Sequence, residues 1–226
     1  GEYPLANGTA TDIKDNRVLI LANWIHQVLI YDSNNVFIKK VNVLPEIQGI
    51  SYIGEDNLIL FRDATSYLQL QTVPFEYQIL NLKEQRIIYT RELKGLAEQL
   101  KDRNEKFLSY GIGRNSNWNF ENKVQYYESF TDTIFNIETN GKRIPRFYIN
   151  REDSKPPKSE IIDNETFNRN RSKYIFIISV FETPRFIFFT FKKGLNDAYI
   201  ARYDKLTQKT KVVSLLNAFE NDLSMI

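Results

Sequence analysis

Few side chains in this sequence could carry out nucleophilic catalysis. The chain has a single histidine, His26, and no cysteine, which excludes thiolate nucleophiles and disulfides. A Ser-His-Asp system would therefore have to use His26, and no nucleophile motif adjoins it. His26 stands at the start of a predicted strand, so we interpret it as an ordinary strand residue and assign no catalytic residue.

Paired carboxylates are the second candidate chemistry, because glycoside hydrolysis needs two of them flanking one bond. Four acidic residues lie near predicted strand ends, although some of the 28 Asp and Glu residues would do so by chance. The four are Asp63, Glu128, Asp132 and Glu182.

A metal centre has a weaker basis. One histidine without cysteine does not make a zinc site. Residues 12–16 (Asp-Ile-Lys-Asp-Asn) offer oxygen ligands for calcium but lack the glycine and the distal glutamate of a calcium-binding loop. We expect a β-turn there, no metal site and no cofactor, with calcium as the alternative left open.

Ligand binding is better supported than catalysis. One predicted loop combines an arginine, a carboxylate, hydroxyls and a tyrosine, and two others add a tryptophan, two arginines and a glutamate. Aromatic faces beside planar polar groups suit sugars or peptides. The competing interpretation is that Arg62 and Asp63 form a structural pair and Trp118 anchors its loop. The candidate ligand-binding residues are Arg62, Asp63, Tyr67, Arg114, Trp118, Glu182 and Arg185.

The elements that must position these residues follow a repeated pattern. Four times, an apolar strand runs into a polar turn and out into a second strand, over residues 28–38, 76–89, 133–149 and 199–215. Asp32, Asn81, Glu138 and Asp204 mark the turns, at intervals of 49, 57 and 66 residues. Such repetition is typical of a β-propeller. The sequence therefore predicts an all-β, propeller-like array of four-stranded antiparallel blades.

The expected boundaries follow from the strand and turn signals. We predict a single domain with blades at residues 9–43, 49–92, 107–149 and 172–215, and an exposed polar insertion at 150–171. One short helix is expected near 94–106, where apolar residues recur at helical spacing. Residues 114–122, which contain Trp118, are predicted to form a loop. Residues 185–191 are almost continuously hydrophobic, which predicts a strand packed on both faces.

Composition narrows the partners. The 226 residues include 16 phenylalanines, 13 tyrosines and 2 tryptophans, a bias that favours sheet over helix. The net charge is only +2, which gives no electrostatic case for nucleic acid. No stretch approaches the roughly 20 apolar residues that span a bilayer.

Several short motifs are spread along the chain: Gly1-Glu2-Tyr3 with Asp12, the hairpin of residues 30–41, Tyr126-Tyr127 with residues 130–137, residues 182–186, and Asn221-Asp222. With these motifs the sequence resembles the six-bladed β-propeller proteins abundant in Bacteroidetes. The resemblance implies a secreted or lipid-anchored cell-envelope protein, periplasmic or on the cell surface, and supplies no catalytic residues. Members of that family continue on both sides of the matching motifs, so we expect a partial propeller or a ring with fewer blades.

These observations favour an extracytoplasmic binding or interaction module for a small glycan, a peptide or another protein. The alternative is an enzyme on the same scaffold, either a glycoside hydrolase or a calcium-dependent lyase. A third hypothesis is structural: open end blades could mediate self-association.

Overall fold

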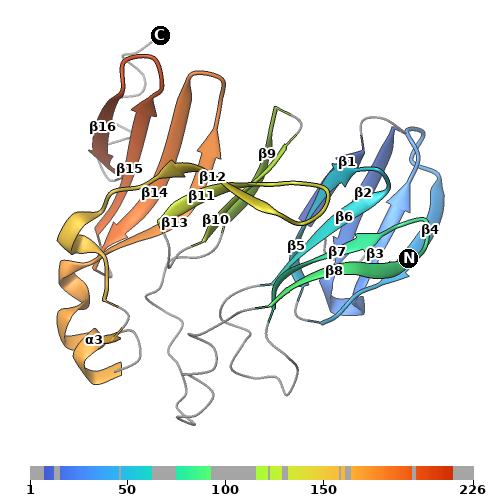
Figure 1. Cartoon of the computed structure of the whole chain (residues 1–226), viewed down its shortest axis with the longest axis horizontal. Helices are drawn as coiled ribbons and strands as arrows, with labels where there is room; N and C mark the ends of the chain where they lie inside the picture. Colours follow the sequence, from blue (N-terminus) through green and yellow to red (C-terminus); the bar gives the residue numbers. More distant parts are fainter. Residues whose placement is uncertain are drawn as a thin grey trace. The chain divides into compact units, whose positions relative to one another are not determined.

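The computed structural model describes residues 8–12, 16–45, 47–62, 75–92, 116–121, 123–128, 132–157, 159–160, 164–194 and 197–215. Their regular structure is dominated by strands, which form four sheets of four strands each (Figure 1). Within each sheet, strands that follow one another along the chain lie side by side. The predicted array of four-stranded blades is confirmed.

The first and second sheets are formed by the amino-terminal half of the chain. The first contains β1 (Gly8–Asp12), β2 (Arg17–Ala22), β3 (Gln27–Tyr31) and β4 (Phe37–Asn42), with a 3₁₀ turn, η1 (Asn23–Ile25), between β2 and β3. The second contains β5 (Ile47–Gly54), β6 (Asn57–Arg62), β7 (Phe75–Asn81) and β8 (Arg86–Glu92). His26 follows η1 and is exposed, and its carbonyl accepts a 2.9 Å hydrogen bond from the Val43 amide.

The third and fourth sheets follow the same plan. The third contains β9 (Ser116–Phe120), β10 (Lys123–Glu128), β11 (Thr133–Ile137) and β12 (Arg143–Tyr148). The fourth contains β13 (Ile175–Glu182), β14 (Phe186–Lys193), β15 (Asp197–Asp204) and β16 (Lys209–Ser214). The predicted loop at 114–122 is wrong, because β9 occupies most of it. Trp118 and Phe120 alternate along β9 and pack inward, and this burial overrides the low strand propensity of the intervening asparagines.

The turns between the third and fourth strands explain the repeated sequence pattern. In three sheets, an Asp or Asn at the end of the third strand accepts a hydrogen bond from a turn amide, which fixes the chain reversal locally. The amides of Asn34, Glu84 and Leu206 donate to Oδ1 of Asp32, Asn81 and Asp204, respectively, at 2.8–2.9 Å. In all four sheets, a residue one or two positions before the fourth strand has a positive φ. These residues are Asn35, Gln85, Gly141 and Gln208.

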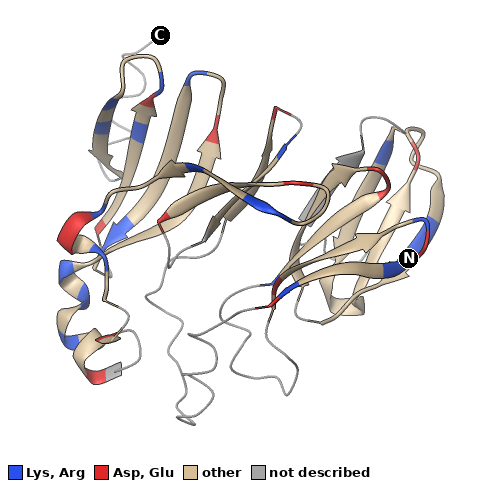
Figure 2. Ribbon diagram, in the orientation of Figure 1, with Lys and Arg blue, Asp and Glu red and all other residues tan. Residues whose placement is uncertain are grey.

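The outermost strands carry a second repeated feature. Each of β4, β8, β12 and β16 ends its sheet and contains two basic residues (Figure 2). Charged side chains on edge strands discourage pairing with other chains, but Arg91, Arg143 and Arg146 are instead committed to ion pairs with Glu76 or Glu182. The residues are Lys39, Lys40, Arg86, Arg91, Arg143, Arg146, Lys209 and Lys211.

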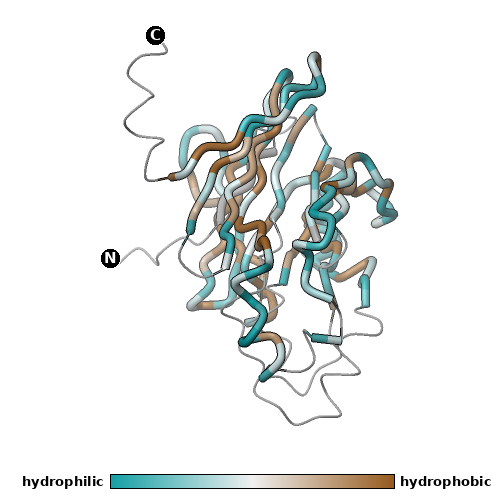
Figure 3. Tube along the Cα trace, turned by 90° about the vertical axis from the view of Figure 1, so that its left-hand side faces the viewer, coloured by the Kyte–Doolittle hydropathy of each residue, from teal (hydrophilic) through white to brown (hydrophobic). Residues whose placement is uncertain are grey.

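The chain divides into two compact units, each with its own core. The first comprises residues 1–101, 121–124 and 136–144, and the second comprises 102–120, 125–135 and 145–226. The first core joins aliphatic residues such as Leu19, Ile30 and Leu58. The second core gathers Tyr127, Ile134 and other residues of the third and fourth sheets. Hydrophobic stretches follow the strands and hydrophilic ones mark many turns (Figure 3).

Residues 150–171 contain short helices: η3 (Glu152–Ser154) and α3 (Asn164–Asn170), which is followed by η4 (Arg171–Lys173). Phe167 of α3 is buried in a small cluster with Tyr174 and Phe176. The helix predicted at 94–106 lies outside the described residues. No helix within the described ranges has the length and hydrophobicity needed to cross a membrane.

The hydroxyl group of Tyr174 has a shifted pKa that can be measured. Burial, together with the hydrogen bond from its hydroxyl to Glu160 (2.5 Å), raises the pKa of Tyr174 to about 12. An unfolded tyrosine ionises near pH 10, so the unfolded chain loses this proton first and stability falls as pH rises from about 10 to 12. We expect the absorbance titration at 295 nm of Tyr174→Phe to lack one group titrating near pH 12. Loss of a group near pH 10 instead would contradict the prediction.

Candidate functional site

The structure distributes the predicted ligand-binding residues over both units. Arg62 ends β6 in the first unit and is buried, with its guanidinium 5.0 Å from the centre of the Phe75 ring. Trp118, Glu182 and Arg185 belong to the second unit. Asp63, Tyr67 and Arg114 lie outside the described residues. That the seven form one site remains a prediction.

Glu182 is the centre of a buried ion-pair cluster. Its side chain is 0% exposed, and both of its oxygens accept bonds from Arg146, at 2.5 and 2.8 Å. Lys205 adds a third bond of 2.8 Å. Arg146 also stacks on the rings of Phe120 and Phe147, with its guanidinium carbon 5.0 and 4.8 Å from their centres. Glu182 at the end of β13 is therefore linked to β12 and to the turn that follows β15.

Arg185 and Trp118 also have local partners. The Arg185 guanidinium bonds to Asp204, at 2.9 and 3.2 Å, and this bond holds the pKa of the Asp204 carboxyl below its usual value. The amides of the following turn contribute to the same shift. Trp118 packs against the core of the second unit.

Of the other three candidate carboxylates, only Asp132 has a side chain that the structure describes, so no catalytic pair can be identified among them. Asp132 is buried and forms ion pairs with Arg151 and Lys155, the latter at 2.7 Å. Asp63 is outside the described residues, as is the side chain of Glu128. No group of three or more potential metal-ligating side chains occurs in the parts of the chain that the structure describes. Of residues 12–16, Asp12 ends β1 and Asn16 has a φ of 50°, while residues 13–15 are not described.

A groove of about 570 Å³ opens along the fourth sheet, within the second unit. One wall is made by side chains of β14 and β15, chiefly Phe189, Phe191 and Tyr203. In the strand register Phe189 opposes Ala201, and Tyr203 opposes Ile187. Directly opposed residues share a sheet face, so these side chains form one continuous wall.

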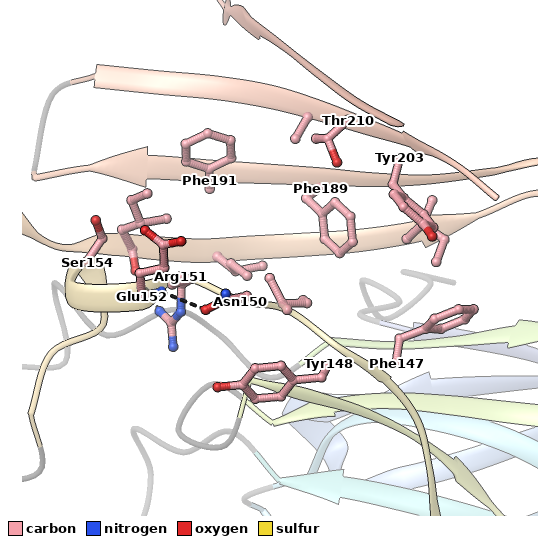
Figure 4. Close-up of a pocket in the computed structure, with 15 residues that line it drawn as sticks. Phe147, Tyr148, Asn150, Arg151, Glu152, Ser154, Phe189, Phe191, Tyr203 and Thr210 are labelled. Carbon is pink, nitrogen blue, oxygen red and sulfur yellow. Dashed lines mark hydrogen bonds between the residues drawn. The ribbon is translucent and has the colours of Figure 1, made fainter. Parts of the chain in front are cut away.

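The opposite wall comes from the end of β12 and the residues after it. Phe147 and Tyr148 face the groove across from Phe189 (Figure 4). The polar side chains of Asn150, Glu152 and Ser154 lie toward the end at which Phe191 stands (Figure 4). Large aromatic surfaces with a few polar groups at one end are the usual composition of a ligand site.

Sequence reasoning did not find this groove. None of the four described candidates, Arg62, Trp118, Glu182 and Arg185, is among its lining residues. The available signal was the alternation in residues 185–191, which sends Ile187, Phe189 and Phe191 to one face and Phe186 and Phe188 to the other. All four phenylalanines of β14 are half-buried and only Ile187 is fully buried, so neither face of the strand is completely packed.

Four consecutive four-stranded meanders with repeated turn chemistry define a β-propeller-like protein. The chain belongs to the family DUF4934, described as a domain of unknown function, whose model matches residues 1–226. None of the curated proteins compared with the chain is significantly similar to it.

Two solved structures share the fold. A protein from Bacteroides fragilis labelled as exported has a TM-score of 0.72 and 17% identity, over 95% of this chain and 59% of that one. A member of the DUF4221 family from Bacteroides vulgatus has a TM-score of 0.57 and 9% identity, over 94% of this chain and 68% of that one. The chain thus spans about three-fifths of the length of the Bacteroides fragilis protein.

Proposed function

We propose that this protein is an extracytoplasmic binding module of the cell envelope whose binding site is the groove on the fourth sheet. The observation that carries the proposal is the groove itself, with about 570 Å³ of space between walls of aromatic side chains. The label of the similar Bacteroides fragilis protein supports an exported location. A small glycan or a peptide is the class of ligand that such a groove accommodates.

Two neighbouring positions in β16 allow a sharp test. Thr210 lines the groove and is exposed, whereas the side chain of Lys211 points to the opposite face of the same strand. Thr210→Trp should fill the groove without disturbing the core, and Lys211→Trp adds the same bulk outside it. Ligands would be sought on an oligosaccharide array and in a display library of random heptapeptides.

We expect Thr210→Trp to weaken the strongest ligand about tenfold or more, equivalent to about 1.4 kcal/mol, and Lys211→Trp to leave its affinity unchanged. Fluorescence anisotropy with the labelled ligand measures both. Equal affinity of the two variants, or no ligand from either source, would refute the proposal.

A further inference from the structure

Two charged residues line the groove, Arg151 and Glu152, and they differ in whether another residue already pairs with them. Arg151 is a lining residue, but its side chain is only 5% exposed and pairs with Asp132 and, at 2.6 Å, with the carbonyl oxygen of Ile175. Glu152 is exposed and forms no ion pair with any described residue. The lining therefore offers a carboxylate to a ligand and offers no uncommitted guanidinium. A cationic ligand fits this arrangement and an anionic one does not.

The aromatic side chains favour a cation as well. Tyr148 is 67% exposed and lines the groove together with Phe189, which packs against the core of the second unit. A cation over the face of such a ring gains about 0.5–1 kcal/mol at an exposed site. The ring of Phe191, which stacks on Tyr199 at 5.2 Å, lies toward the same end of the groove as Glu152 (Figure 4). A basic group bound at Glu152 would thus approach aromatic surface.

The backbone of Glu152 adopts an unusual conformation beside the groove. Glu152 has a φ of 47°, a left-handed conformation that glycine or asparagine adopts at lower cost. The amide of Glu152 donates a 3.0 Å bond to Oδ1 of Asn150, and the amide of Ser154 donates a 2.9 Å bond to the carbonyl of Arg151. The turn therefore keeps an acidic side chain at the groove despite its conformational cost.

A peptide fits the rest of the groove better than a glycan. Sugars are usually held by several planar polar groups that bond to two hydroxyls, but the Arg151 guanidinium and Oδ1 of Asn150 already have partners, which leaves the Glu152 carboxylate. The walls are mainly aliphatic and aromatic, which suits apolar side chains.

From these observations we infer that the groove binds an extended peptide that carries a lysine or arginine flanked by apolar residues. The basic side chain pairs with Glu152, and the apolar side chains contact Phe189 and Tyr203. This inference rests on the proposed function of the groove and specifies its ligand.

The test uses the whole chain and the random heptapeptide library. We expect selected peptides to be enriched in a basic residue flanked by apolar ones. The best peptide is then compared with a version that has norleucine in place of the basic residue. Glu152→Gln should weaken the basic peptide about two- to fivefold and leave the norleucine peptide unchanged. The control is Asp153→Asn, which removes an exposed acid next in sequence that does not line the groove.

The outcomes separate the two proposals. Selected peptides without a basic residue, or equal effects of Glu152→Gln and Asp153→Asn, overturn the inference. If oligosaccharides bind, lose affinity in Thr210→Trp and are not displaced by peptides, the inference fails while the proposed function stands. If no ligand of either class responds to Thr210→Trp, both fail.

Discussion

Glu182→Gln should destabilise the second unit by about 3–5 kcal/mol, because removing one partner of a buried ion pair leaves the other charge uncompensated. The Glu182 side chain is 0% exposed, and two cations, Arg146 and Lys205, converge on it. The amide of glutamine carries no charge and presents hydrogens where one of these cations donates. The substitution nearly preserves side-chain volume, so the loss reports on charge rather than on packing.

The free energy of unfolding is measured in urea by the fluorescence of Trp118, which belongs to the second unit, in a Trp24→Phe background. The control is Glu165→Gln, because Glu165 belongs to the same unit and pairs with Arg169 at 2.9 Å while both side chains are about two-thirds or more exposed. An exposed pair contributes about 0–1 kcal/mol. Similar losses in the two variants would mean that the Glu182 cluster is not a buried electrostatic link.

Gly141→Ala should destabilise the first unit more than Gly54→Ala does. Gly141 has a φ of 83°, and an added Cβ would lie 2.5 Å from the Tyr89 ring. The Gly141 carbonyl also accepts a 2.8 Å bond from the hydroxyl of the buried Tyr77, so the turn cannot shift freely. The left-handed conformation costs about 1–2 kcal/mol and overpacking about 1–3 kcal/mol, which predicts a loss of about 2–5 kcal/mol.

Gly54→Ala separates these two contributions. Gly54 has a φ of 93° but no atom within 4 Å of an added Cβ, so only the backbone cost of about 1–2 kcal/mol applies. Thermal unfolding followed by circular dichroism compares the variants. In a Tyr89→Ala background, Gly141→Ala should cost no more than Gly54→Ala. A full-sized loss that persists there would show that the contact with Tyr89 is not its cause.

Much of the fold could be predicted because its signals are local. Strand alternation and the turn residues Asp32, Asn81 and Asp204 act within about ten residues, and the structure shows their side chains bonding to turn amides. The strand β9 could not be predicted in this way. Its Ser-Asn-Trp-Asn-Phe sequence has weak local preference, and it is stabilised by contacts of Trp118 and Phe120 with distant residues.

The candidate site shows the same division. The sequence marks Glu182 and Arg185 as polar residues near a strand end. Only the tertiary structure shows that Glu182 already forms an ion pair with Arg146, which is 36 residues away in the chain. The groove is likewise assembled from β12, the turn after it, and β14 to β16.

By itself, the sequence determined the four-stranded repeat, the turn chemistry and the absence of thiol chemistry, because each depends on residue type and short-range spacing. The tertiary structure alone decided which carboxylates are committed to ion pairs and which aromatic side chains face one another across open space. These properties depend on the packing of sheet faces from segments far apart in the chain, and no local pattern encodes that packing.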